Sequence, residues 1–161
     1  MLSRNPLTLH RRSQAGFTLA ELVTVAAVMA VLALVSLPVA KFTAKRSKEA
    51  DLRQALRQMR SAIDEYKRYS DAGLITVDLG TEGYPKKLEV LVEGVEIVGQ
   101  VDKKLKLLRR IPVDPMTGKD EWGMRSFQDA SDATSWGGED VYDVYSSSQA
   151  VGLNGVPYRK W

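Results

Sequence analysis

Residues 17–40 constrain the fold of this chain most strongly, because they form an almost unbroken apolar run. The polar side chains within it are Thr18, Glu21, Thr24 and Ser36. As a helix, the run is long enough to cross a bilayer core of roughly 30 Å. Glu21 stands out, since an unpaired carboxylate is costly to bury in an apolar phase. We therefore expect a helix that lies in a membrane or in the apolar core of an assembly, and a partner that neutralises Glu21.

The segment before this run, residues 1–16, is basic. It contains Arg4, Arg11 and Arg12 and no acidic residue, so the net charge of +3 lies entirely within it. The rest of the chain is balanced, which gives no reason to expect nucleic-acid binding. A basic segment followed by an apolar one predicts membrane insertion with the N-terminus inside the cell.

A cleavable secretory signal is the alternative explanation for these two segments. Such a signal has a shorter apolar core, and a cleavage site with small residues follows that core. In this chain the small residues Ala15 and Gly16 precede the apolar run. A cut beside them would leave the run on the mature protein.

Composition excludes several classes of functional site. The chain has no cysteine, and its one histidine, His10, belongs to the basic segment. Disulfides, thiol chemistry and cysteine zinc sites are therefore excluded. One protomer also cannot build a catalytic triad with a histidine base or a histidine-rich metal site. With no glycine-rich phosphate loop either, we predict that the protein is not an enzyme.

Residues 41–70 carry a second helical pattern. Apolar side chains recur every three or four positions, the spacing of a helix with one buried face: Leu52, Leu56, Met59, Ile63 and Tyr66. Neither glycine nor proline occurs between Lys41 and Asp71, and we expect Gly73 to cap the helix. The pattern predicts one long helix that runs from the apolar segment to about residue 70. Pro38 interrupts this helix, so we expect a kink or local unwinding near residues 34–38.

The rest of the chain is polar, with short patterned stretches. Residues 83–94, "GYPKKLEVLVEG", predict a short helix with Pro85 near its first turn and Gly94 at its end. Residues 140–148, "DVYDVYSSS", predict a strand, and residues 122–127, "WGMRSF", are its expected partner. A long helix packed on a small antiparallel sheet is an α+β fold.

The apolar run and its flank carry a family resemblance. The stretch "GFTLAELVTVAAVMAVL", preceded by a short basic leader, resembles the N-terminal signal of type IV pilins and type II secretion pseudopilins. The resemblance implies that a prepilin peptidase cuts between Gly16 and Phe17 and then N-methylates Phe17. It matches Glu21 to the family's glutamate at the fifth mature position, and Pro38 to the family's helix-breaking proline.

This resemblance implies a role for Glu21 in assembly. In the family, the glutamate of one subunit neutralises the terminal amine of a neighbour as the helices bundle, which makes Phe17, Glu21 and Pro38 assembly residues. For the uncleaved precursor, the alternative is that Glu21 reaches the membrane interface close to the leader arginines. The chain would then comprise a cleaved leader (1–16), a transmembrane and assembly helix (17–40) and a globular domain (41–161) that includes the end of the long helix.

The globular region is similar to the major, G-type pseudopilins in the order of four stretches: "TEGYPKKLEVLVEG", "LLRRIPVDPMTG", "WGMRS" and "DVYDVYSSS". This similarity implies a pilin-like fold and a structural function. The protein would form a helical homopolymer for type II protein secretion. Its other partners would be the prepilin peptidase, an inner-membrane assembly platform and minor pseudopilins.

The resemblance also implies a location. Before assembly, a single span would hold the protein among lipids of the bacterial inner membrane, with the globular domain in the periplasm. The protein would then pass into a periplasmic or cell-surface filament. One alternative is a type IV pilus subunit for adhesion, motility or DNA uptake. Another is a single-pass membrane protein with an exported binding or enzymatic domain.

Calcium is the one cofactor that the resemblance suggests, because G-type pseudopilins commonly bind it in the loop after the last strand. Calcium takes six to eight oxygen ligands, usually including carboxylates, but residues 146–161, "SSSQAVGLNGVPYRKW", contain no acid. The remaining oxygen donors are Asp140, Asp143, Ser146 and Asn154. The favoured alternative is a loop without metal, held by the packing of Tyr158 and Trp161.

Two charged stretches remain to be interpreted. Residues 129–140, "DASDATSWGGED", are a second candidate calcium loop, although a solvated loop is the simpler interpretation. Residues 103–110 are the densest basic stretch. We interpret them as a solvated face, with an inter-subunit surface facing "DASDA" as the alternative.

Overall fold

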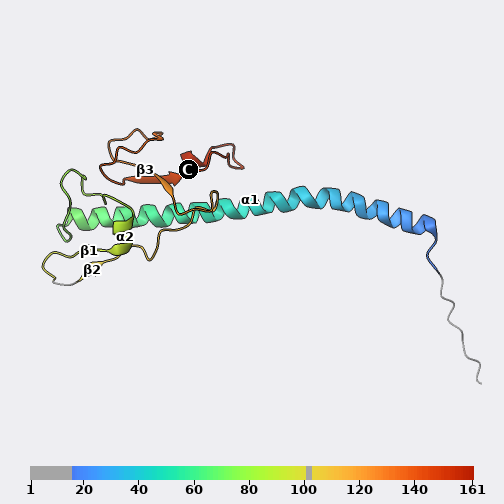
Figure 1. The fold of residues 1–161 in the computed structure, drawn as a ribbon, viewed down its shortest axis with the longest axis horizontal. Coiled ribbons are helices and arrows are strands. Elements are labelled where there is room, and N and C mark those ends of the chain that lie inside the picture. The colour runs from blue at the N-terminus through green and yellow to red at the C-terminus, as the bar shows by residue number, and fades with distance from the viewer. Residues whose placement is uncertain (1–15, 101–102) are drawn as a thin grey trace, which may run out of the picture. The chain divides into compact units, whose positions relative to one another are not determined.

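The structure is a computed structural model that describes residues 16–100 and 103–161, with the backbone alone for residues 35–38. It divides into two compact units, one that ends at Lys41 and one that comprises Phe42–Trp161. The long helix α1 (Leu19–Asp71) contributes to both units. Figure 1 shows α1 as the longest element of the chain.

Helix α1 confirms the long helix predicted from the two sequence patterns. Its apolar first half is the one helix of the described residues that is long and apolar enough to cross a membrane. The helical assignment continues through residues 34–38, so the local unwinding expected near Pro38 does not occur. A proline removes one backbone hydrogen bond, and helical bonds on both sides can maintain the helix, as membrane helices often do.

The C-terminal end of α1 is closed by a glycine, as predicted. Gly73 has a φ of 65°, a left-handed conformation that glycine adopts without steric cost. Its N–H donates to the carbonyl of Ser70, and the next N–H, from Leu74, donates to the carbonyl of Tyr69. This pair of bonds is the Schellman motif, which satisfies carbonyls that the helix end would otherwise leave without partners.

The predicted apolar stripe of α1 forms one wall of the core of the second unit. Leu52, Met59 and Ile63 have no exposed surface, and Leu56 and Tyr66 are buried beside them. Residues from every later segment pack against this stripe: Ile75, Leu88, Leu91, Leu108, Trp122, Val141, Val144 and Tyr158. Burial of this apolar surface is the main force that folds the unit.

Short elements complete the second unit. The expected helix in residues 83–94 is only α2 (Glu89–Glu93), because the residues before it form bends and a turn. Gly94 ends it as predicted. Strands β1 (Val95–Glu96) and β2 (Lys104–Leu105) pair antiparallel. The predicted pair of strands is confirmed as β3 (Trp122–Arg125) and β4 (Asp143–Ser146), antiparallel with Trp122 opposite Ser146.

A 3₁₀ turn, η1 (Tyr158–Lys160), precedes the last residue. In Figure 1 the two strand pairs lie on opposite sides of the second half of α1. The architecture is thus the predicted α+β, pilin-like arrangement of a long N-terminal helix with small antiparallel sheets.

Candidate functional site

The first turn of α1 is held by a threonine cap. The N–H of Glu21 donates to Oγ1 of Thr18 over 3.2 Å, and the N–H of Leu22 donates to the carbonyl of Thr18. Thr18 and Glu21 have the spacing of a capping box, in which a threonine precedes the helix and a glutamate occupies its third position. The dipole of the helix favours a carboxylate there. Thr18 is a site residue that the sequence analysis missed, although its signal, T-x-x-E before an apolar run, is present.

The surface around Glu21 is unusually apolar. Phe17 and Leu19 are 74% and 81% exposed, and Glu21 is exposed among them. Within residues 16–100 and 103–161, Glu21 makes no ion pair. Among the described residues, the start of α1 therefore presents a carboxylate without a cation on an exposed apolar surface.

Farther along the same unit, apolar side chains form a shallow hollow of about 290 Å³ lined by Thr24, Val25, Val28, Met29 and Leu32. Four side chains of this lining are each more than half exposed: Val25, Val28, Met29 and Leu32. An exposed apolar surface of this extent indicates contact with lipid or protein. Lipid and the apolar helices of other copies are the two environments that suit it.

Gly16, just before this helix, has no structural need to be glycine. A β-carbon at this position would meet no atom within 4 Å, and the residue does not have the positive φ that favours glycine. The described fold would therefore accept a larger residue at this position.

In the second unit, Glu49 of α1 binds the C-terminal segment. The Glu49 side chain accepts hydrogen bonds from the N–H of Leu153 (2.7 Å) and from the hydroxyl of Tyr158 (3.0 Å). Glu49 is 3% exposed and Tyr158 is 1% exposed. Burial, chiefly, and the neighbouring Glu49 raise the pKa of Tyr158 to about 12. Tyr158 therefore stays a neutral donor at physiological pH.

Trp161 packs against the same stretch of α1. Its ring meets Tyr158 edge to face at 5.1 Å, and the guanidinium of Arg53 lies 4.4 Å from the ring centroid. Gly152 allows this packing, because a β-carbon there would lie 2.6 Å from the Trp161 ring. Glu49, Tyr158 and Trp161 together hold the last loop on α1 through protein contacts.

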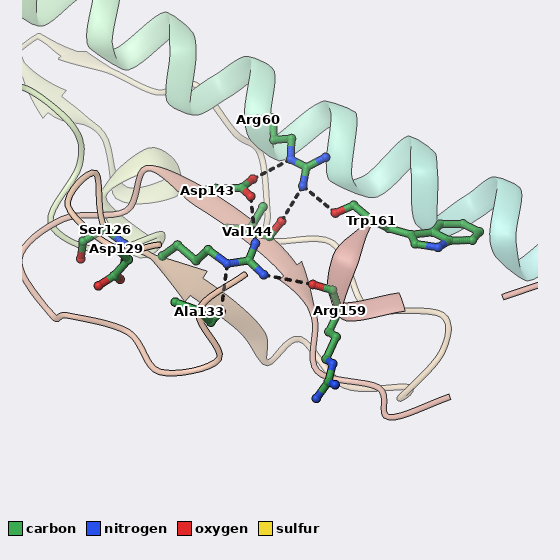
Figure 2. A network of polar contacts seen from close by, with 9 residues as sticks. Arg60, Ser126, Asp129, Ala133, Asp143, Val144, Arg159 and Trp161 are labelled. Carbon is green, nitrogen blue, oxygen red and sulfur yellow. Dashed lines mark hydrogen bonds and ion pairs between the residues drawn. The ribbon is translucent and has the colours of Figure 1, made fainter. Parts of the chain in front are cut away.

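Two arginines and one aspartate join the sheet, the helix and the C-terminus; we call Arg60, Arg125 and Asp143 the arginine clamp. Nε of Arg60 lies 2.7 Å from Oδ1 of Asp143, and Nη1 of Arg125 lies 3.1 Å from Oδ2. Figure 2 shows the guanidinium of Arg60 directed at Asp143. The same guanidiniums donate to four carbonyls, those of Val144 and Trp161 from Arg60 and those of Ala133 and Arg159 from Arg125.

Three of the four oxygen donors proposed for calcium, Asp143, Ser146 and Asn154, already have protein partners. Both carboxylate oxygens of Asp143 bind the arginine clamp. Ser146 is buried and donates to Oδ2 of Asp114 over 2.6 Å, while Oδ1 of Asn154 accepts from the N–H of Val156. Within the described ranges, no group of three or more histidine, cysteine, aspartate or glutamate residues could hold a metal. The donor set therefore does not fit calcium.

Asp140, the fourth donor, is the last residue of the loop 127–140, and it is fully buried. Its Oδ1 accepts from the N–H of Phe127 (2.9 Å), but its Oδ2 has no hydrogen-bond partner among the residues that the structure describes. Burial, chiefly, together with the nearby acids Glu139 and Asp129, raises the pKa of Asp140, against the opposing effect of the Phe127 hydrogen bond. Asp140 thus holds its proton more tightly than an exposed aspartate.

Asp129, in the same loop, behaves in the opposite way. Its Oδ2 accepts from the N–H of Ser126 (2.8 Å) and from the N–H of Gly137 (3.0 Å). These two bonds lower the pKa of Asp129 because they stabilise the charged form. As a carboxylate, Asp129 therefore bridges Ser126 and Gly137 across the loop, and we call this bridge the Asp129 staple. One acid of the candidate calcium loop "DASDATSWGGED" is thus engaged in holding the fold.

Comparison with known proteins gives one match, at the N-terminal segment. Residues 11–37 match the family described as "Prokaryotic N-terminal methylation motif". The matched residues include Gly16, Phe17 and Glu21, together with the cap at Thr18. The comparisons with curated proteins and with solved structures gave no match. The match supports a type IV pilin-like filament subunit and does not distinguish a secretion pseudopilin from a pilus subunit.

Proposed function

We propose that this chain is the precursor of a pilin-like filament subunit. A prepilin peptidase would cut between Gly16 and Phe17 and methylate Phe17, and residues 17–40 would anchor the product in the inner membrane until it polymerises. The observation that carries this proposal is the position of Glu21, on the capped first turn of an exposed apolar helix within the matched motif. The function is structural rather than catalytic.

The chemistry of the cut supplies the cation that Glu21 lacks. Cleavage creates an amine at Phe17, four residues before Glu21, so each mature copy carries one new positive charge and one carboxylate in its apolar segment. Two opposite charges in an apolar phase are tolerated when they pair. Pairing the amine of one copy with Glu21 of its neighbour would neutralise both and fix the axial register of adjacent helices.

The proposed machine is a type II secretion pseudopilus, in which the growing filament would move substrates outward, driven by an ATPase outside this chain. Contact between two of the stretches that carry the resemblance supports this choice. Asp114 of "PVDP" accepts from the N–H of Met116 within its own turn and from the hydroxyl of Ser146 at the end of β4. The turn and the "YS" strand thus depend on each other structurally. Short periplasmic filaments, rather than long surface fibres, would support the pseudopilus.

Mass spectrometry of the membrane-derived protein tests the processing step. The expected mature N-terminus is N-methylated Phe17. An intact leader, or a cut after residue 40, would instead indicate a membrane-anchored protein of another class. The measurement requires no knowledge of the secreted substrate.

A substitution at Glu21 tests the assembly step. Glu21→Ala should leave membrane insertion unchanged and abolish filaments, because the new amine loses its counter-charge. Thr24→Ala is a matched control, since Thr24 lies one turn farther along the same helix and its hydroxyl bonds only to the Glu21 carbonyl in the described structure. Normal filaments from Glu21→Ala would contradict the proposal.

A further inference from the structure

Charge is segregated within the globular unit. In the second unit, the first part of α1 (residues 42–60) is predominantly basic, with Lys45, Arg46, Lys48, Arg53, Arg57 and Arg60 against Glu49 and Asp51. Residues 126–158 contain neither lysine nor arginine, and their acids are Asp129, Asp132, Glu139, Asp140 and Asp143. We call residues 42–60 the basic side and residues 126–158 the acidic side; the two stretches touch where Arg60 pairs with Asp143.

The basic side contains a groove of about 410 Å³ between α1 and the C-terminal turn, which we call the arginine groove. Its cationic lining is Arg53, Arg57, Arg60 and Lys160, and its remaining lining is Leu56, Asn154, Val156 and Trp161. No carboxylate side chain lines it. Figure 2 shows two of its residues, Arg60 and Trp161, where α1 meets the end of the chain.

Two cations of the arginine groove are already engaged, and two are available. Arg60 belongs to the arginine clamp, and Arg53 stacks on Trp161 with Glu49 at 4.0 Å. Arg57 and Lys160 are exposed, and their side chains form no ion pair or hydrogen bond within the part of the chain that the structure describes. The groove thus offers two positive charges beside a fixed aromatic ring, a suitable site for a carboxylate.

The acidic side presents a carboxylate on a rigid turn. The turn of residues 130–133 is closed by the N–H of Ala133 donating to the carbonyl of Ala130 (2.9 Å). It is held on one side by the Asp129 staple and on the other by Arg125, whose Nε donates to the carbonyl of Ala133 (2.9 Å). Asp132 lies at the tip of this turn and is exposed. A pre-organised acidic tip loses little conformational freedom on binding.

We propose that the arginine groove of one copy binds the acidic tip at Asp132 of the next copy. The proposal rests on the filament function and names one of its contacts. Groove and tip are different surfaces of one molecule, so their contact is head to tail, and repeating it generates a helical polymer when the rotation between copies does not close into a ring. Exposed ion pairs are individually weak and sensitive to salt. The apolar helices therefore supply most of the affinity, and this contact sets the orientation of the globular units.

The basic stretch at residues 103–110 fits this role less well. In the β1–β2 register, Glu96 lies opposite Lys104, so an acid of the same sheet already faces part of that stretch. The arginine groove differs in having an aromatic ring in its lining and two cations, Arg57 and Lys160, without a counter-ion among the described residues. We therefore place the acceptor for "DASDA" in the arginine groove.

Disulfide cross-linking tests the contact directly, because the natural chain has no cysteine. Assembled full-length protein that carries both Arg57→Cys and Asp132→Cys should form a ladder of cross-linked multimers on oxidation. The matched control is Gln58→Cys with Asp132→Cys. Gln58 is the next residue of α1 but lines a different hollow, with Asp51 and Pro112. Equal ladders from the two pairs, or none from the Arg57 pair in intact filaments, would overturn the proposal.

Charge reversal gives an independent readout. Arg57→Glu and Asp132→Arg should each reduce the filament yield several-fold, and the double variant should restore it. Failure of the double variant to recover, while each single variant is folded, would contradict the pairing. Loss of binding to anionic phospholipid vesicles in Arg57→Glu, with filaments unchanged, would assign the groove to lipid and also overturn the proposal.

These outcomes separate this contact from the filament function itself. If Phe17 is methylated and Glu21→Ala abolishes filaments, but the Arg57 pair gives no ladder, the filament function stands and this contact is wrong. If wild-type protein keeps its leader and forms no filament, the filament function itself has failed.

Discussion

Replacing Glu49 by alanine should release the C-terminal segment from α1. The buried carboxylate of Glu49 accepts from the Leu153 N–H and the Tyr158 hydroxyl, and Arg53 lies 4.0 Å from its other oxygen. Hydrogen bonds to a charged group contribute about 1.5–3 kcal/mol each to stability. The two direct bonds are not additive, because they share one acceptor oxygen. We expect Glu49→Ala to lower the free energy of unfolding by about 3 kcal/mol, and Glu49→Gln by about 1 kcal/mol.

Urea unfolding of the unit Phe42–Trp161 measures this loss. Asp51→Ala is the matched control, because Asp51 is an exposed acid two residues farther along α1 and its side chain forms no hydrogen bond or ion pair within the described ranges. It should change stability by less than about 0.5 kcal/mol. A Glu49→Ala protein that unfolds at the same urea concentration as the control would refute the reasoning.

Alkaline titration provides a second measure of the same site. The folded pKa of Tyr158, about 12, lies above the ordinary value of 10.0. Between these values the folded state holds a proton that the unfolded state has lost, so stability falls as pH rises. This contribution is complete below pH 10 and amounts to on the order of 2 kcal/mol. Glu49→Ala should lower the pKa only in part, because burial is the larger cause. Tyr158→Phe should remove this part of the alkaline loss, and an unchanged pH profile would contradict the assignment.

Three further substitutions test the packing of the same unit. Asp140→Asn should raise the melting temperature at neutral pH and change it less in acid, because the raised pKa of Asp140 marks a carboxylate that the fold disfavours when charged; equal shifts at both pH values would contradict this. Arg125→Lys should cost about 2 kcal/mol in urea unfolding, since lysine cannot reproduce the three bonds of the guanidinium to Asp143 and to the carbonyls of Ala133 and Arg159; a loss below 0.5 kcal/mol would contradict a buried clamp. Gly123→Ala should cost about 1–3 kcal/mol, because its β-carbon would lie 2.3 Å from the ring of Tyr145, and an unchanged melting curve would show that the ring can move.

Local patterns predicted the elements that local forces determine. The three-to-four spacing of apolar residues gave α1 and its buried stripe from Leu52 to Tyr66, because a helix repeats every 3.6 residues. Gly73 was predicted as the cap of α1 and adopts the left-handed conformation. The predicted start of α2 was too early. Pro85 suits the first turn of a helix, and nothing in the sequence showed that the residues beside it would form non-helical bends.

The contacts that fix the C-terminal loop could not be predicted in the same way. Glu49 and Tyr158 are 109 residues apart in sequence, and Arg60 and Asp143 are 83 apart. Their pairing depends on how the strands dock on α1, which no local spacing encodes. Thr18 is different, because the capping-box pattern that it forms with Glu21 is local and can be recognised from the sequence alone.

The distribution of satisfied and unsatisfied charges suggests where copies of this chain meet. In the globular unit, the buried Glu49 accepts a hydrogen bond from the Leu153 N–H, and the buried Arg125 pairs with the half-buried Asp143. Three of the charged side chains that form no ion pair or hydrogen bond in the described structure lie at the proposed contacts: Glu21 at the start of α1, Arg57 in the arginine groove and Asp132 on the acidic tip. Burying a charge without a partner is costly, whereas leaving one exposed costs little. A chain that folds alone and then polymerises can therefore carry such charges on the surfaces that later meet. Each contact that forms then neutralises charges that were exposed before.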